Sequence, residues 1–298
     1  MKHLKAIIAI TILWLMSLLP LKWAQSIGVF IGNRLSKKNE STLYKITKIN
    51  LELCFPELSP DQINSLSSAS LLETGKTFSE MGMSWLWSPG RTLKTIKHIS
   101  NASLVEESLS FGKGVILLAP HLGNWEILNL YVSKRYTFTA MYRPPKMKLM
   151  DSFIKKVRAR LGTKLAPADA SGVRTIMKAL KRGEMIGILP DQEPATGGEF
   201  SPFFGNNAYS MKLLPQLVKQ TGAKVICGYA ERLSNGEGFN LHFIEADPDI
   251  YSKDLSIAIA GMNKSVERCV RALPEQYQWE YKRFNHQPEG VLSPYQKR

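Results

Sequence analysis

Amphipathic segments and short apolar runs alternate along most of the chain. Three times a helical pattern is followed by a glycine turn and then by an apolar run, within residues 109–119, 173–189 and 213–229. The apolar runs are short and rich in branched side chains, which favours buried strands over helices. This succession predicts an α/β fold with a central mixed sheet flanked by helices.

The amino-terminal region differs from the rest because residues 6–21 form an uncharged apolar run between Lys5 and Lys22. As a helix this run reaches about 24 Å, short of the roughly 30 Å hydrocarbon core of a bilayer, so it either spans with help from its lysines or dips in. A cleaved signal peptide is the competing interpretation, although residues 22–24 form a poor cleavage site. We predict a membrane-anchoring helix in residues 1–30 and one globular domain in residues 31–298.

Charge and cysteine content limit the location and the partners. The chain of 298 residues has 39 Lys and Arg against 25 Asp and Glu, a net charge of +14 that favours anionic partners of any class. More basic residues follow the apolar run than precede it, which predicts a cytoplasmic body. Three widely spaced cysteines indicate neither a disulfide framework nor a metal cluster and fit a reducing compartment. With an anchor present, an enzyme at the membrane surface is favoured over a nucleic-acid binder.

A histidine follows the first predicted strand. His121 comes directly after Pro120, and Glu126 lies five positions later. Five helical residues at about 100° each would place these two side chains on different faces, so His121 must precede the helix, for which Asn124 is a good N-cap. The first helical turn could then return Glu126 to the imidazole, leaving the other ring nitrogen to take a proton from an alcohol. The alternative is a surface histidine beside a glutamate that complements the helix dipole.

An acid follows the second predicted strand in the same way. Asp191 lies just past the apolar run that ends at Leu189. Ligands of open α/β sheets bind at the carboxyl ends of strands, so we expect His121, Glu126 and Asp191 to share a cleft. The alternative for Asp191 is ordinary turn chemistry between two prolines.

Two further segments are candidates for substrate binding. Arg143 precedes two prolines, so its guanidinium is a stiff fork suited to a phosphate or a carboxylate. The basic residues of the helix expected at 149–161 fit either anion binding or a solvated face. Phe204 belongs to an aromatic turn that either lines an acyl channel or packs as a loop.

Five blocks, in this order, resemble the late acyltransferases of lipid A biosynthesis, a branch of the lysophospholipid acyltransferase superfamily. They are HLGNWE at 121–126, YRPP at 142–145, PDQ at 190–192, PFFG at 202–205 and QWEYKRF at 278–284. The resemblance covers nearly the whole chain. It implies an enzyme of the bacterial inner membrane that esterifies a hydroxyl of a lipid A precursor with a fatty acyl group delivered by acyl carrier protein.

The resemblance also implies residue roles. His121 is expected to be the general base with Glu126 as its partner, and Arg143 is expected near the reacting acyl or phosphate groups. Asp191 and Arg283 fall in matching blocks and are expected to contribute to substrate binding. The last block departs from the family pattern at Glu280 and Lys282, which leaves the role of Arg283 open.

The chemistry expected is direct acyl transfer. An alcohol attacking a thioester needs a base and an oxyanion site, so we expect no metal and no cofactor beyond the acyl carrier protein as co-substrate. Backbone amides around Gly123 and Asn124, with Arg143 nearby, are the candidate oxyanion donors. No G-x-S-x-G motif occurs, which argues against an acyl-enzyme hydrolase. The alternatives are an acyltransferase acting on another lysophospholipid or glycolipid, and a catalytically silent lipid-binding protein.

Overall fold

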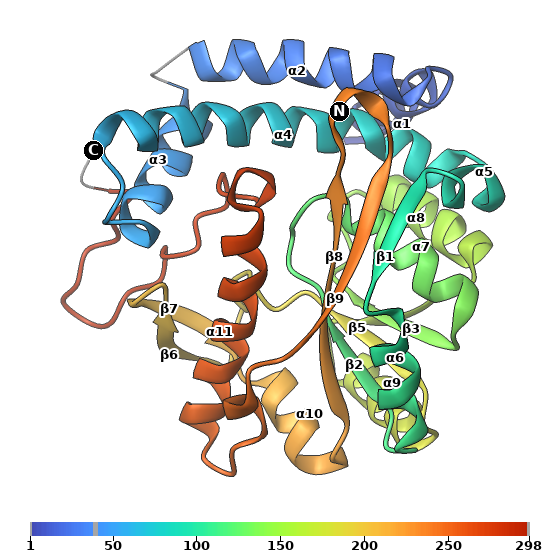
Figure 1. The fold of residues 1–298 in the computed structure, drawn as a ribbon, viewed down its shortest axis with the longest axis vertical. Helices are drawn as coiled ribbons and strands as arrows, with labels where there is room; N and C mark the ends of the chain where they lie inside the picture. Colours follow the sequence, from blue (N-terminus) through green and yellow to red (C-terminus); the bar gives the residue numbers. More distant parts are fainter. Residues whose placement is uncertain (1, 38–40, 297–298) are drawn as a thin grey trace.

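The computed structural model describes residues 2–37 and 41–296 and is built on a seven-stranded mixed sheet. The strand order is β1-β9-β8-β2-β5-β3-β4 (Figure 1). The strands are β1 (Ile96–Ser100), β2 (Val115–Leu118), β3 (Phe138–Tyr142), β4 (Lys164–Pro167), β5 (Met185–Ile188), β8 (Lys224–Arg232) and β9 (Phe239–Glu245). Neighbouring strands are parallel except β8 and β9, which are antiparallel. A separate antiparallel hairpin joins β6 (Gly198–Phe203) and β7 (Asn206–Met211).

Helices cover both faces of the sheet, as the alternation of strand side chains requires. On β2, Ile116 and Leu118 pack with α9 (Ala170–Lys181), α10 (Leu213–Thr221) and α11 (Leu255–Ala272), whereas Val115 and Leu117 pack with α7 (Trp125–Arg135) on the other face. Further helices are α3 (Thr42–Cys54), α4 (Pro60–Leu86), α5 (Pro89–Leu93), α6 (Ala102–Ser110) and α8 (Lys148–Leu161). The predicted α/β fold with a mixed sheet flanked by helices is therefore confirmed.

All three predicted successions of helix, glycine and strand are present. The helices α6, α9 and α10 are followed by Gly112, Gly183 and Gly222, each with a positive φ, and then by β2, β5 and β8. The three strands are neighbours in the order β8-β2-β5. The sequence pattern thus located the middle of the sheet, where the carboxyl ends of parallel strands lie side by side.

The amino-terminal apolar run forms part of two helices instead of one. The helix α1 (Lys2–Ser17) ends before Pro20, and α2 (Leu21–Lys37) begins after it. Within residues 2–37 and 41–296, no helix combines the length and the apolar character needed to cross a bilayer. A transmembrane helix is therefore not supported, because the run is divided near Pro20 into helices of 16 and 17 residues. The domain boundary predicted after residue 30 falls inside α2.

Both amino-terminal helices pack on the long helix α4 (Figure 1). An added Cβ on Gly28 of α2 would collide with the backbone of Gly75 and Lys76, and one on Gly82 of α4 would collide with the backbone of α1 at Leu13. Glycine permits this close approach because it has no side chain. The first two helices are therefore in tight contact with the body of the protein.

The buried carboxylate of Glu80 joins α2 and α4 to the sheet. Glu80 of α4 accepts hydrogen bonds from Arg232 at the end of β8 (2.6 and 2.7 Å), from Gln25 of α2 (2.7 Å) and from Asn124 (2.9 Å). Arg232 also forms an ion pair with Glu73 at 2.8 Å. Since Glu80 is fully buried and Arg232 is 3% exposed, the two charges compensate each other away from water.

Candidate active site

The turn after β2 carries His121 and is held by backbone hydrogen bonds on both sides. Gly123 has a φ of +61°, and an added Cβ would collide with the carbonyl oxygen of Ala230 in β8. The amides of Gly123 and Asn124 donate to the carbonyl oxygens of Gln276 (3.0 Å) and Ala230 (2.9 Å). The predicted N-cap is confirmed, because the Asn124 side chain accepts a hydrogen bond from the amide of Ile127 at the start of α7.

His121 is paired with Asp191, which follows the neighbouring strand β5. The imidazole Nδ1 lies 2.9 Å from Asp191 Oδ1, and the backbone amide of His121 donates to Oδ2 at 2.9 Å. Burial raises the pKa of the Asp191 carboxyl, but the charge of His121 and these hydrogen bonds outweigh it, so the pKa lies below its ordinary value. An ionised Asp191 keeps the proton on Nδ1 and leaves the lone pair of Nε2 for another group.

The expected contact between Glu126 and His121 is wrong. Glu126 is buried in the first turn of α7 and forms an ion pair with Arg158 of α8, with 2.6 Å between Arg158 Nη2 and Glu126 Oε1. Asp191, and not Glu126, forms the hydrogen bond with the imidazole Nδ1. Glu126 nevertheless lines the same cavity as His121, and its Oε2 has no hydrogen-bond partner among the described residues.

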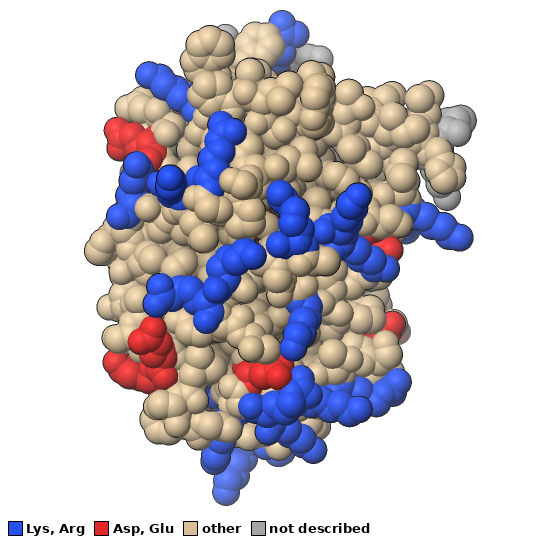
Figure 2. Space-filling view, turned by 90° about the vertical axis from the view of Figure 1, so that its right-hand side faces the viewer, with Lys and Arg blue, Asp and Glu red and all other residues tan. Residues whose placement is uncertain are grey.

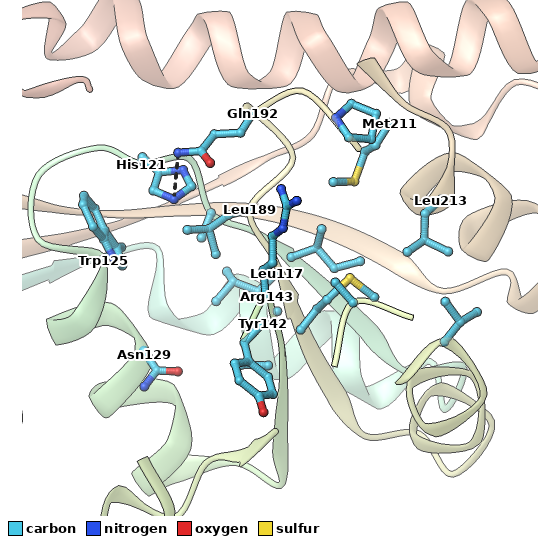
Figure 3. A pocket seen from close by; sticks show the side chains of 18 of the residues that line it. Leu117, His121, Trp125, Asn129, Tyr142, Arg143, Leu189, Gln192, Met211 and Leu213 are labelled. Atoms are coloured by element: carbon cyan, nitrogen blue, oxygen red, sulfur yellow. Dashed lines mark hydrogen bonds between the residues drawn. The ribbon is translucent and has the colours of Figure 1, made fainter. Parts of the chain in front are cut away.

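The backbone amides expected to stabilise the oxyanion are also engaged elsewhere. Those of Gly123 and Asn124 donate to Gln276 and Ala230, as described above, and so do not face a substrate. A side-chain amide lies closer to the imidazole: Gln192 Nε2 is 3.5 Å from His121 Nε2 (Figure 3). Gln192 also donates to Gln278 Oε1 at 3.1 Å, which fixes its orientation.

A cavity of about 540 Å³, here called the large cavity, opens beside His121 at the carboxyl ends of β2, β3 and β5. Its volume is in the range of small-molecule sites. Figure 3 shows His121, Trp125 and Gln192 at one end, with Leu117, Tyr142 and Arg143 below them. Its apolar lining includes Leu117, Ala119, Leu128, Phe138, Ala140, Ile188, Leu189 and Leu213. This arrangement suits a hydrocarbon chain whose polar end lies at His121.

The other predicted binding residues are divided between the cavity and the core. Arg143 is exposed and lines the large cavity, and its contact with a substrate stays a prediction. Arg283 is 3% exposed, does not line the large cavity and donates to Tyr209 O and Ser210 Oγ of β7. Phe204 is also buried and packs against Phe55, which supports the packed-loop alternative. Asn124 donates a hydrogen bond to Glu80 and does not line the large cavity.

Several residues at the site were not singled out from the sequence. Gln192 and Gln278 belong to blocks that carry the family resemblance, so their motifs were noted without a role. Arg158 was grouped with a basic helix that fits a solvated face, yet its side chain is 17% exposed and bonded to Glu126. Among the described residues, no group of three or more His, Cys, Asp or Glu side chains is placed to hold a metal ion.

Comparison with known proteins gives one consistent family. The model of the family described as bacterial lipid A biosynthesis acyltransferase matches residues 1–286. Among curated relatives, a lipid A biosynthesis lauroyltransferase of Escherichia coli (strain K12) is 28% identical over 290 residues, covering 97% of this chain and 94% of the relative. A lipid A biosynthesis palmitoleoyltransferase of the same strain is 29% identical over 289 residues, with coverages of 95% and 92%.

Proposed function

Because the chain belongs to the bacterial lipid A biosynthesis acyltransferase family, we propose that it transfers a fatty acyl group from acyl carrier protein to a hydroxyl of a lipid A precursor. The acceptor hydroxyl is the 3-hydroxyl of an acyl chain already attached to the glucosamine backbone, and the product is an acyloxyacyl ester. The observation that carries this proposal is the His121–Asp191 pair at the polar end of an apolar cavity of about 540 Å³.

The reaction requires two proton transfers and one exchange of bonds at the carbonyl carbon. His121 Nε2 removes the proton of the acceptor hydroxyl, and the oxygen attacks the thioester carbonyl carbon. The tetrahedral intermediate collapses with cleavage of the carbon–sulfur bond, and the imidazolium returns its proton to the thiolate. Asp191 stabilises the transient positive charge on the ring through Nδ1. The product ester and the carrier thiol balance the two substrates.

The oxyanion of the intermediate needs donors near His121 Nε2. Gln192 Nε2 lies 3.5 Å from that nitrogen, so its amide is placed to donate to a substrate oxygen once the base is occupied. One such preorganised donor is typically worth about 3 to 4 kcal/mol in the transition state. Arg143 at the cavity edge supplies a positive charge for a phosphate or for the developing anion.

The donor reaches the site from a basic surface. Figure 2 shows many Lys and Arg and few Asp and Glu side chains on the right-hand side of the molecule as seen in Figure 1, where α5, α7 and α8 lie. Next to the cavity, Arg143, Lys146, Lys148, Lys155 and Lys156 are exposed. An acidic carrier protein docking there would place its acyl thioester at the large cavity.

The acceptor comes from the membrane, on which the protein rests by its amino-terminal helices. Large apolar side chains are exposed on this surface: Leu4, Ile7, Ile8, Ile12, Trp14, Leu15, Leu18, Trp23, Phe30 and Ile31. Such a concentration is typical of a membrane-binding surface. We assign the protein to the cytoplasmic face of the bacterial inner membrane. Replacing Trp14 and Trp23 together by Asp is expected to abolish co-sedimentation with phosphatidylethanolamine–phosphatidylglycerol vesicles, whereas unchanged binding would refute this assignment.

The function is tested with purified protein, acyl carrier protein bearing a 12-carbon acyl group, and a tetra-acylated lipid A precursor. Mass spectrometry should find the precursor heavier by one acyl group, and His121→Ala should lose this product while it retains the melting temperature of the wild type. Transfer to a lysophospholipid but not to the lipid A precursor would favour the alternative acceptor. Transfer from acyl coenzyme A only would refute the carrier-dependent donor.

A further inference from the structure

A second, smaller cavity of about 70 Å³ also contacts His121. It is lined by Thr74, Thr77, Phe78, Met81, His121, Trp125, Gln276, Tyr277, Gln278 and Glu280. Of the described residues, only His121 and Trp125 line both this second cavity and the large cavity. His121 can therefore be reached from two separate cavities. This arrangement suits a reaction between two substrates that each carry an acyl chain.

One side of the second cavity is a single face of α4. Thr74, Thr77, Phe78 and Met81 have the spacing that brings side chains together on one side of a helix. The other side is the segment 276–280, which is fixed beside the catalytic turn because the amide of Gln278 donates to His121 O at 3.1 Å. Both sides are thus held in place relative to the imidazole.

Like the large cavity, the second cavity is mostly apolar, but it includes side chains that form hydrogen bonds. Thr74 Oγ1 donates to Glu280 Oε2 at 3.1 Å, and Gln278 accepts from Gln192 at 3.1 Å. Burial raises the pKa of the Glu280 carboxyl. A carboxyl that holds its proton can donate to an ester or hydroxyl oxygen of a bound lipid without placing a buried charge there.

The apolar part of the second cavity connects it to the surface formed by the first helices. Phe78 lines the cavity and is 64% exposed. It lies about one turn of α4 from Gly75, where α2 crosses, and about one turn from Gly82, where α1 crosses. An acyl chain that leaves the membrane beside α1 and α2 would contact Phe78 before it reached the polar side chains of the second cavity.

We propose that the second cavity receives the hydroxyl-bearing segment of the acceptor acyl chain, while the large cavity holds the acyl chain of the donor. The assignment rests on the proposed function and extends it to the acceptor. It requires that the two substrates approach His121 from different sides of the imidazole, with the Gln192–Gln278 pair between them.

The test compares one substitution in two places. Met81→Trp fills the second cavity, and Met141→Trp is the matched control in the large cavity. With the purified full-length protein, Met81→Trp should raise the KM for the tetra-acylated acceptor by about tenfold or more, as misfit of a few carbons in a pocket does, with the KM for the acyl-carrier donor unchanged. Met141→Trp should raise the donor KM and leave the acceptor KM unchanged.

A milder variant covers the case in which Met81→Trp fails to fold. Thr74→Val keeps the shape of the side chain and removes the donor to Glu280, so it should raise the acceptor KM by about threefold to tenfold, the effect of one lost hydrogen bond. A change in donor KM or in donor chain preference, or no change in either KM, would overturn the assignment while leaving the proposed function intact. Absence of transfer by the wild type would instead refute the proposed function.

Discussion

His121 and Asp191 are joined twice across neighbouring strands, through the imidazole Nδ1 and through the backbone amide, each at 2.9 Å from one carboxylate oxygen. The double contact fixes both the orientation of the ring and the position of the turn that carries it. A general base needs this constraint, because proton abstraction depends on which nitrogen presents its lone pair.

The first prediction distinguishes the two acidic residues near His121. Asp191→Asn should lower kcat by about 10²- to 10⁴-fold, because the amide no longer stabilises the imidazolium and can hold the wrong tautomer. Glu126→Gln, the same chemical change in the other acid, should have a smaller effect, since Glu126 is bonded to Arg158 and not to His121. Steady-state kinetics would check this, and a larger loss in Glu126→Gln than in Asp191→Asn would contradict it.

The second prediction concerns the stability that the ion pair between Glu126 and Arg158 provides. Arg158→Met should lower the free energy of unfolding by about 3 kcal/mol, because it leaves the carboxylate of Glu126 buried without its partner. The double variant Glu126→Gln, Arg158→Met should recover much of this loss, since no unpaired charge remains. Urea denaturation of Arg158→Met, of Glu126→Gln and of the double variant measures the coupling, and strictly additive losses would count against the pair.

The third prediction is a pH dependence of stability set by Glu280. Its folded pKa is raised by burial, so the stabilisation from this group is fully present below the ordinary carboxyl pKa and is lost as the pH rises through the folded value. Glu280→Gln keeps an acceptor for Thr74 and does not titrate. Relative to the wild type, the variant should therefore gain stability between about pH 4 and neutrality. Denaturation curves across this range test the sign, and a pH-independent difference would exclude it.

The fourth prediction concerns the length of the transferred chain. Ala140 is buried and lines the large cavity from β3, so Ala140→Leu shortens the space for hydrocarbon. Each methylene that no longer fits costs about 0.8 kcal/mol, or about fourfold in kcat/KM, so preference should move to shorter acyl groups. Competition among carrier-bound donors of different length, read by mass spectrometry, measures the shift. An unaltered product distribution would place the donor chain elsewhere.

The fifth prediction tests the basic surface. Transfer from the acyl carrier protein should fall more steeply with salt than transfer from a small acyl thioester, because screening weakens attraction between a basic face and an acidic protein. Replacing Lys146 and Lys148 by Ala should reduce this difference in slope, since both side chains are exposed near the cavity. Parallel salt dependences for the two donors would argue against docking at this surface.

Short-range sequence patterns were sufficient to predict the elements that position His121. The strand at Val115, the N-cap at Asn124 and the glycine turns all follow from short-range preferences, and each is present. The partner of the imidazole was misassigned, because Asp191 lies 70 positions away and reaches His121 only through the adjacency of β2 and β5. Strand order is decided by packing across the whole sheet. The spacing of residues within one motif therefore does not predict which strands are neighbours.

The second cavity could not be predicted for the same reason. Its two sides come from Thr74 on α4 and Glu280 near the carboxyl end, which are separated by 206 positions. Arg158 shows a related limit, because the ion pair of a basic side chain on a largely exposed helix is recognised only when its partner Glu126 on another helix is known. Arg283 and Phe204 show the opposite limit. Both belong to blocks that carry the family resemblance, yet both side chains are buried in the body of the protein.

The carboxylate of Glu80 accepts hydrogen bonds from α2, from β8 and from Asn124, the N-cap residue of α7, so the amino-terminal helices are not an independent appendage. Truncation of the chain before residue 31, intended to give a freely dispersed enzyme, would remove the hydrogen bond from Gln25 to Glu80. It would also expose the surface of α4 on which α1 and α2 pack. The packing of the first two helices on α4 and the order at the histidine turn are consequently parts of one mechanical unit.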